Sequence, residues 1–191
     1  MGHRFDVKHA SRLLSEERGR LIPADLVLDK LALTREDAFV DVGVGPGYFA
    51  LPAAQRVSRV YGVDIEPKML EMVEQRAREA GLNNIHTVTS EAQSIKVDNE
   101  VADKALMAFV LHEVPSRLET LNELHRVLKP AGTVMILEWM AKPTESGPPL
   151  HERLKESQVE QDLQEAGFTI QETWYPNDQH FAVIAEKQGK V

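Results

Sequence analysis

The chain has 191 residues, of which 42% are hydrophobic and 27% are charged, a composition typical of a globular protein. This length favours a single domain, and the 0 cysteines exclude disulfide scaffolds, cysteine-bound zinc, iron–sulfur clusters and thiol nucleophiles. The 22 basic and 30 acidic residues give a net charge of −8, which disfavours a nucleic-acid partner.

Targeting and membrane signals are absent from the sequence. The first residues are polar and charged, without the apolar stretch of a signal peptide. The longest apolar run, residues 105–111, is far too short to cross a bilayer. We therefore expect a soluble protein without a membrane span, located in the cytoplasm.

Helix and strand patterns alternate along most of the chain. Residues 1–20 are polar with scattered apolar positions and predict an N-terminal helical arm, and residues 21–191 predict one domain. From residue 23 onward, hydrophobic periodicity and capping residues mark the elements. Strands are predicted at 38–42, 59–63, 85–88, 104–111 and 133–139, and helices at 23–31, 47–54, 67–80 and 116–128.

The last part of the chain breaks this alternation. Residues 142–149 are rich in proline and small polar residues and predict a loop, which a helix at 151–166 follows. Two strands, 168–174 and 180–186, then come without a helix between them. The predicted fold is therefore α/β: a doubly wound seven-stranded sheet, mostly parallel with an antiparallel last strand.

A glycine-rich segment joins the first predicted strand to the next helix. Asp41 is followed by Gly43, Gly45 and Gly47 at alternate positions. Glycines let the backbone approach a ligand closely, and ligands bind beyond the carboxyl ends of the strands in such sheets. We therefore expect a ligand here rather than a simple tight turn.

The spacing of these glycines argues against a dinucleotide. The pattern is G-x-G-x-G, whereas the dinucleotide fingerprint is G-x-G-x-x-G. Asp41 would repel a pyrophosphate but attract a cationic amino-acid group. The helix start beyond Gly47 would suit a carboxylate.

Asp64 provides a second anchor at the end of the second predicted strand. It follows Gly43 by about 20 residues, the offset at which a carboxylate accepts hydrogen bonds from ribose hydroxyls. The alternative is a surface aspartate that caps the helix predicted from Pro67. Its position directly after an apolar strand favours ribose.

Together these segments resemble class I S-adenosylmethionine-dependent methyltransferases, in the ubiquinone/menaquinone-methyltransferase-like (type 11) small-molecule branch. The resemblance implies a Rossmann-like fold. Each block is weak alone, but the blocks occur in the order typical of the family. They are VDVGVGPG at 40–47, VYGVDIEPKML at 60–70, SEAQSI at 90–95, ADKALMAFVLHEV at 102–114 and LHRVLKPAGTVMILEW at 124–139.

The resemblance implies S-adenosylmethionine as the cofactor and S-adenosylhomocysteine as its product. Met69 has an alternative role in the helix core, and Glu91 stands where the family often has an aspartate. The implied contacts are Asp41, Gly43, Gly45 and Gly47 at the methionine part, Asp64 at the ribose, Ile65, Met69, Glu91 and Ala92 at the adenine, and Ala108 and Phe109 beside the sulfonium.

The acceptor side is less defined. His112, just past the fourth predicted strand, is the candidate catalytic base, with a polar residue closing the strand as the alternative. Glu138 and Trp139 are further acceptor-side candidates, although Trp139 could simply be packing. Phe5, in the arm, is a candidate substrate contact, and the arm and the 142–149 loop are candidate lids.

The other histidines share no spacing, and no aspartate/asparagine trio or histidine pair indicates a metal. We therefore expect no metal. The Asn-Pro-Pro-Tyr motif of amino-methylating nucleic-acid and protein enzymes is also missing, in agreement with the acidic charge. The histidines predicted to lie on the surface or on helix faces are His3, His9, His86, His125, His151 and His180.

Methyl transfer to a small-molecule acceptor by in-line displacement is the function this pattern implies. A non-catalytic S-adenosylmethionine-binding protein is an alternative that the sequence does not separate from it. A nicotinamide-dependent oxidoreductase is a weaker alternative, because the glycine spacing, Asp41 and the lack of a Tyr-x-x-x-Lys pair oppose it.

Overall fold

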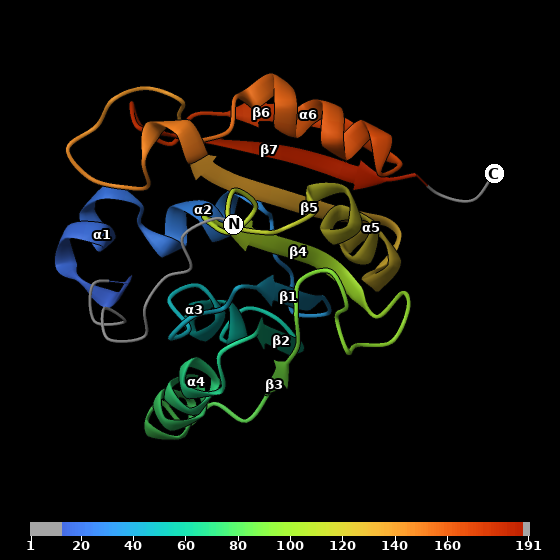
Figure 1. The fold of residues 1–191 in the computed structure, drawn as a ribbon. Helices are drawn as coiled ribbons and strands as arrows, with labels where there is room; N and C mark the ends of the chain where they lie inside the picture. The colour runs from blue at the N-terminus through green and yellow to red at the C-terminus, as the bar shows by residue number, and fades with distance from the viewer. Residues whose placement is uncertain (1–12, 189–191) are drawn as a thin grey trace.

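A seven-stranded sheet forms the centre of the computed structural model, which describes residues 13–188. In Figure 1 the strands follow one another upward in the order β3-β2-β1-β4-β5-β7-β6. All pairs from β3 to β5 are parallel, and β7 runs antiparallel to both of its neighbours, which confirms the predicted sheet. The strands are β1 Ala38–Val42, β2 Arg59–Asp64, β3 Ile85–Thr89, β4 Ala102–Ala108, β5 Leu128–Trp139, β6 Phe168–Trp174 and β7 His180–Lys187.

The strand order changes direction at β1, which has β2 on one side and β4 on the other. In open parallel sheets such a switch point leaves a crevice beyond the carboxyl ends of the strands. The glycine-rich segment after β1 lies at this point.

Helices cover both faces of the sheet. α2 and α4 contribute buried residues such as Val27 and Val73 to the core on one face, whereas α5 and α6 contribute Leu121 and Val159 to the other. The helices are α1 Glu16–Leu21, α2 Ala24–Lys30, α3 Ala50–Ala54, α4 Pro67–Glu79, α5 Arg117–Val127 and α6 Glu156–Glu165, with a 3-10 turn at Leu150–Glu152.

Local sequence explains where the well-predicted helices begin and end. α4 starts with Pro67 in its first turn, which suits the fixed backbone angle of proline, and Gly81 follows its end with φ of 68°. In α5, the Ser116 side chain accepts a hydrogen bond from the Glu119 N–H, as the capping-box pattern predicts.

Several predicted boundaries are wrong, each for a local reason. The helix expected at 47–54 begins only at Ala50, because the glycine loop occupies the preceding residues. β4 ends at Ala108 rather than at residue 111, because Phe109 takes a left-handed φ of 62°. The helix expected at 151–166 is a 3-10 turn followed by α6.

β5 begins earlier than predicted. The sequence predicts residue 128 as the end of the preceding helix and residues 129–132 as its stop, but all five residues form the start of the strand. The pairing with β4 shifts register there, between the Ala102↔Leu128 and Lys104↔Thr133 pairs. A bulge of this kind accommodates residues that do not fit a regular ladder.

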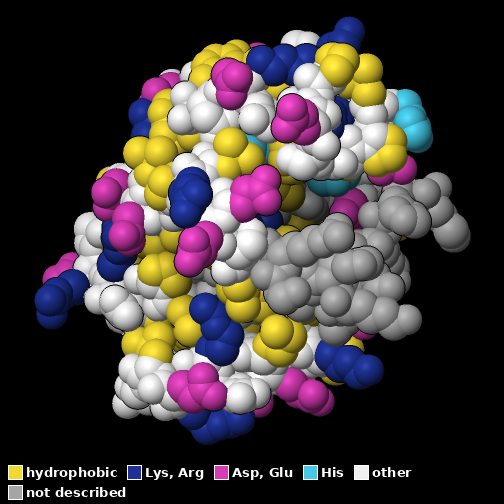
Figure 2. Space-filling model, turned by 90° about the vertical axis from the view of Figure 1, so that its left-hand side faces the viewer, with side chains coloured by type: hydrophobic (Ala, Val, Ile, Leu, Met, Phe, Trp, Pro, Cys, Tyr) yellow, Lys and Arg dark blue, Asp and Glu magenta, His cyan; other side chains and the backbone are white. Residues whose placement is uncertain are grey.

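The surface carries charges of both signs. Figure 2 shows acidic and basic side chains interspersed, with no broad basic area on the described part of this face. No helix in residues 13–188 is long and apolar enough to cross a membrane.

Candidate functional site

The loop after β1 requires its glycines for two physical reasons. Gly43, Gly45 and Gly47 have φ of 75°, 51° and 85°, values that side-chain-bearing residues rarely adopt. A Cβ on Gly43 would lie 2.3 Å from Val110, and one on Gly47 would lie 2.4 Å from Leu51. The loop therefore folds tightly against the sheet and presents its backbone at the switch point.

Asp64 lies directly beside this loop. Its Oδ2 accepts a hydrogen bond from the Gly45 N–H at 2.9 Å, and its Oδ1 accepts one from the Glu66 N–H at 2.9 Å. Burial raises the pKa of Asp64, although these N–H groups partly offset the effect. The carboxylate thus joins the glycine loop to the start of α4, and each oxygen keeps a lone pair for a further donor.

Asp41 is a buried carboxylate without full hydrogen bonding. It is 2% exposed, and its Oδ2 has no hydrogen-bond partner in the described part of the chain. Burial, followed by the nearby charge of Asp64, raises the pKa of Asp41 to about 7, against the opposing effect of Arg18. A buried oxygen left in this state is suited to a donor supplied by a ligand.

Arg18, on α1, is a site residue that the sequence analysis missed. Its guanidinium carbon lies 5.0 Å from the ring centre of Tyr48 and 5.2 Å from that of Phe109. Its Nε is buried and has no partner among residues 13–188. Burial lowers the pKa of Arg18, and the charge of Asp41 partly offsets this. The side chain remains cationic because a guanidinium is protonated in proteins.

An aromatic cluster lies at the ends of β4, β5 and β7. Phe109, whose N–H donates to the Leu137 carbonyl, lies 5.7 Å from Trp139 and 5.1 Å from His180, between ring centres. Trp139 and His180 are 4.2 Å apart. The structure therefore brings together the predicted residues Phe109 and Trp139, with His180 added.

The surface position predicted for His180 is wrong. The residue is 1% exposed because it pairs with Trp139 in the β5–β7 ladder. Burial, together with the charges of Arg18 and Arg153, lowers its pKa to about 4. His180 is therefore neutral at physiological pH.

His112 and Glu138 form a second polar pair. His112 Nδ1 lies 2.8 Å from Glu138 Oε2, and the His112 N–H donates to Glu138 Oε1 at 3.2 Å. Their side chains are 4% and 1% exposed. Burial opposes the charge on His112, but the hydrogen bond and charge of Glu138, with smaller contributions from other glutamates, prevail and raise its pKa.

The His112–Glu138 pair and the aromatic cluster around Trp139 lie on opposite faces of the sheet, at the same end of β5. Glu138 and Trp139 are neighbours in β5, so their side chains point to opposite faces. His112 also lines a cavity of about 480 Å³ beside the start of α5 and the 3-10 turn. The other residues of this cavity are Arg117, His151, Glu152, Arg153, Leu154 and Gln158.

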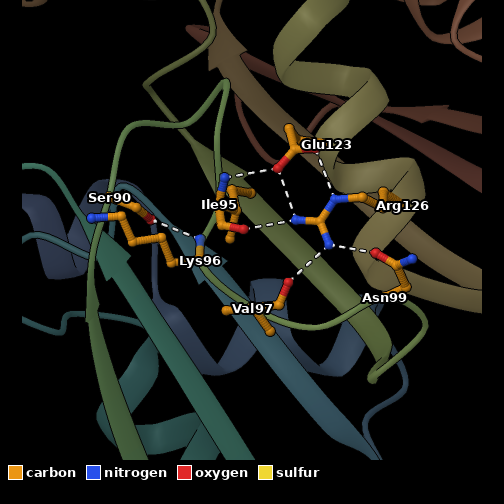
Figure 3. A network of polar contacts seen from close by, with 7 residues as sticks. All are labelled: Ser90, Ile95, Lys96, Val97, Asn99, Glu123 and Arg126. Carbon is orange, nitrogen blue, oxygen red and sulfur yellow. Dashed lines mark hydrogen bonds and ion pairs between the residues drawn. The ribbon is translucent and has the colours of Figure 1, made fainter.

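The predicted adenine segment follows β3 and is clamped by α5. Arg126 donates to the carbonyl oxygens of Ile95 and Val97 and pairs with Glu123 (Figure 3). The Ile95 N–H in turn donates to Glu123 at 2.8 Å. These contacts fix the backbone that follows Glu91, which is itself exposed.

The loop at residues 142–149 packs over Trp139. A Cβ on Gly147 would lie 2.8 Å from the indole ring, and the Arg153 guanidinium lies 5.3 Å from its centre. Arg153 also donates to the carbonyl oxygens of Lys142 and Ser146. The loop is therefore fastened beside the aromatic cluster.

The remaining predicted positions are placed as follows. Ile65 and Ala92 are half-buried near the sheet edge, and Met69 is buried on α4. Phe5 lies outside the described residues. Within residues 13–188, no group of three or more His, Cys, Asp or Glu side chains is arranged to hold a metal.

Comparisons with known proteins agree with this arrangement. The profile of a family described as "Methyltransferase domain" matches residues 40–136. Curated relatives include demethylmenaquinone methyltransferases of Geobacillus kaustophilus, 30% identical over 59% of this chain and 49% of that protein, and of Staphylococcus epidermidis, 32% identical over 59% and 47%. The chain thus spans about half the length of these relatives.

A solved structure is similar over nearly its whole length. It is a SAM-dependent methyltransferase from Aquifex aeolicus, 28% identical, with a TM-score of 0.90 over 96% of this chain and 99% of that one.

Proposed function

Because the chain belongs to the methyltransferase domain family, we propose that it transfers a methyl group from S-adenosylmethionine to a small-molecule acceptor. The observation that carries the proposal is a set of buried, unpartnered polar atoms at the switch point of the sheet. Among residues 13–188, Asp41 Oδ2 is an acceptor without a donor, and Arg18 Nε is a donor without an acceptor.

These atoms match the two charges of an amino-acid group. Asp41 is suited to hold an α-ammonium and Arg18 an α-carboxylate, and the charge of each shifts the pKa of the other. The aromatic rings around Arg18 exclude water and strengthen such contacts. The residues of this chain therefore fit the methionine part of S-adenosylmethionine.

The other cofactor roles follow the order of the strands. Asp64 would accept hydrogen bonds from the ribose, using the lone pairs that its backbone contacts leave open. The glycine loop would lie along the cofactor, and Ala108 and Phe109 would border the sulfur. The residues proposed to surround the adenine are Ile65, Met69, Glu91 and Ala92.

S-adenosylmethionine supplies a methyl group already activated by its positive sulfur. The chain's own task is then to align the acceptor with that carbon and to keep water out. His112, oriented by Glu138, would take a proton from an acceptor that must lose one. Trp139 and Phe109, on the opposite face at the same end of the sheet, would contact the acceptor where it passes the strand ends, and Phe5 remains a predicted contact.

The acceptor is proposed only as a small molecule. The curated relatives carry the name demethylmenaquinone methyltransferase, which describes a quinone-type acceptor for those proteins. Location in the cytoplasm, the absence of a nucleic-acid partner and the arm and loop as lids stay predictions from the sequence.

Titration calorimetry with S-adenosylhomocysteine tests the cofactor site. We expect binding to the wild type, and Asp64→Ala to weaken it by about 1–3 kcal/mol, the range for a lost charge-assisted hydrogen bond. Glu66→Ala, which removes a neighbouring carboxylate, is the matched control and should bind as the wild type does. No binding of either S-adenosyl compound, or binding of a nicotinamide nucleotide instead, would overturn the proposal.

Mass spectrometry tests the transfer itself. The purified protein, supplied with S-adenosylmethionine, should add one methyl group to at least one compound in a panel of small aromatic and aliphatic acceptors. Binding of S-adenosylhomocysteine with no methylated product from any acceptor would favour the alternative of a non-catalytic binding protein.

A further inference from the structure

The cavity of about 480 Å³ beside the start of α5 and the 3-10 turn is not used by the proposed cofactor contacts. Its volume is typical of small-molecule sites. His112, the candidate base, is one of its lining residues. Phe109, proposed to border the sulfur, comes directly before the turn that carries His112, which the Glu113 N–H closes by donating to the Val110 carbonyl. The cavity therefore lies beside the proposed transfer site.

Two side chains offer free hydrogen-bond donors to this cavity. Arg117, the first residue of α5, donates from its Nε to Asp162 on α6, so one edge of its guanidinium is occupied. Its Nη1 and Nη2 groups have no hydrogen-bond partner among residues 13–188. These two groups form the end-on fork of a guanidinium, which matches the two oxygens of a carboxylate. Gln158 accepts the Lys155 N–H through Oε1, which leaves its Nε2 as a further donor.

Arg153 adds a positive charge at the wall of the same cavity. Burial lowers the pKa of Arg153, and no carboxylate in the described part of the chain offsets the effect. The charge therefore remains unbalanced beside the cavity. Its hydrogen bonds all go to neutral backbone carbonyl groups, those of Met140, Lys142, Ser146 and Pro148.

The charge of the cavity wall favours a singly charged anion. Glu152 is the one carboxylate among the described lining residues, and it forms no ion pair with Arg117 or Arg153 within residues 13–188. Like Glu138, it favours the protonated form of His112. A doubly charged anion fits less well than a singly charged one, because Glu152 repels the additional charge. One free guanidinium fork likewise matches one carboxylate.

We propose that Arg117 binds a carboxylate group of the methyl acceptor in this cavity, with Gln158 as a second donor and the reacting group of the acceptor towards His112. The inference rests on the proposed function and names its substrate class, a small carboxylic acid. The carboxylate serves for recognition, and the methyl group goes to another nucleophilic atom of the same molecule. Arg117 stays protonated and takes no part in proton transfer.

Matched ligands that differ in charge test this inference. NMR titration of the full chain, saturated with S-adenosylhomocysteine, would compare pentanoate with pentanamide, which has the same shape without the charge. We expect pentanoate to bind at least about tenfold more tightly, the effect of a charge-assisted hydrogen bond. Butyl phosphate should bind more weakly than pentanoate. In Arg117→Gln, the ratio between pentanoate and pentanamide should fall to about one.

Arg56→Gln is the matched control, because it removes the same charge and breaks the same kind of ion pair. Arg56 pairs with Asp25 and Asp29 of α2, which packs on the face of the sheet opposite α5. This variant should keep the wild-type ratio. If Arg117→Gln fails to fold, the ¹⁵N signals of the Arg117 guanidinium in wild-type protein provide the answer, since pentanoate should shift them and pentanamide should not.

Turnover provides a second readout. The acceptor panel would contain carboxylic acids together with their carboxamides, and we expect each methylated acid to have a higher kcat/KM than its carboxamide. Arg117→Gln should raise KM for the acid about tenfold or more and change kcat less, as loss of a binding contact predicts. Arg56→Gln should leave both constants unchanged.

The outcomes separate the two proposals. Equal affinities of pentanoate and pentanamide in the wild type, a ratio that survives in Arg117→Gln, unmoved Arg117 signals, or tighter binding of butyl phosphate would each overturn this inference. Carboxamides methylated as efficiently as their acids would overturn it as well. Failure of S-adenosylhomocysteine to bind would instead overturn the proposed function, and that measurement does not involve Arg117.

Discussion

Burial of the Asp41 carboxylate lowers the free energy of unfolding of the ligand-free protein, and a ligand that pairs with the carboxylate can offset this loss. The pKa of its carboxyl rises from an ordinary value of 3.8 to about 7 on burial. Between these values the folded chain binds the proton more tightly than the unfolded chain does. The free energy of unfolding should therefore fall as pH rises from about 4 to about 7. Strain of this kind is common where function and stability compete.

Asp41→Asn removes the charge and keeps the shape. We expect the ligand-free variant to be more stable than the wild type by at least about 1 kcal/mol at pH 8, and the difference to shrink towards pH 5. Urea unfolding at several pH values measures it. The same variant should bind S-adenosylhomocysteine more weakly. Asp98→Asn, on the exposed surface, is the control and should show no pH-dependent gain in stability over the wild type. If the difference in stability between Asp41→Asn and the wild type is the same at every pH, the prediction is contradicted.

His112 and Glu138 make a prediction about the pH dependence of turnover. A base works in its neutral form, and the pKa of His112 is raised, so kcat/KM should already decline at a pH above the ordinary value for histidine. Glu138→Gln removes the charge that favours the imidazolium. The acid limb should therefore move to lower pH, and kcat should fall about 10- to 100-fold from lost orientation.

Glu113→Gln is the comparison for this pair. Glu113 lies 3.7 Å from His112 Nε2, whereas Glu138 lies 2.8 Å from His112 Nδ1. Glu113→Gln should therefore shift the acid limb of the pH profile less than Glu138→Gln does. If both variants leave the pH profile in place, His112 does not act as the base. If His112→Ala lowers cofactor affinity more than kcat, the residue belongs to the cofactor pocket.

At the scale of elements, the segment between β3 and β4 depends on one side chain from α5. This segment carries Glu91, and its Ile95 side chain is buried in the core. Arg126 holds it with a planar fork whose nitrogens reach Ile95, Val97 and Asn99 while also pairing with Glu123 (Figure 3). Only the guanidinium geometry serves all of these acceptors together.

Arg126→Lys keeps the positive charge but loses the planar set of hydrogen-bond donors of the guanidinium. We expect faster amide hydrogen exchange in residues 95–99 and about three- to tenfold weaker binding of S-adenosylhomocysteine, because the adenine segment loses its support. Arg117→Lys alters an ion pair with Asp162 at the other end of α5 and is the control. Unchanged exchange in residues 95–99 would show that the clamp is not needed.

At the scale of the whole molecule, the sequence predicts features set by neighbouring residues, and it does not predict features set by contacts between residues far apart in the chain. The sheet, the glycine loop and Asp64 are encoded by neighbouring residues, so periodicity and spacing predict them. The burial of His180 depends on its register with Trp139, and that pairing joins strands separated by a loop, a 3-10 turn, α6 and β6. Arg18 belongs to α1, six residues whose pattern gives no sign of contact with the sheet.

The two missed residues come from segments far apart in the sequence, α1 and the start of β7, which lie side by side in the fold. The Leu21 carbonyl at the end of α1 accepts a hydrogen bond from Asn177, just before β7. β4 likewise ends early because Phe109 adopts a left-handed conformation, which turns its ring towards both groups. No pattern within either segment reveals this meeting, since it arises only when the sheet is assembled.

This arrangement predicts that the cofactor couples α1 to the sheet. If Arg18 holds the carboxylate of the methionine part while Asp41 holds its ammonium, S-adenosylhomocysteine should slow amide hydrogen exchange in residues 16–22. Adenosine lacks the amino-acid part and should slow exchange near Asp64 without affecting α1. Arg18→Gln should abolish the protection of α1 and weaken S-adenosylhomocysteine binding about 5- to 50-fold, while adenosine binding stays unchanged. Equal protection of α1 by both ligands would mean that the helix responds to closure of the nucleoside site, and Arg18 would then have a purely structural role.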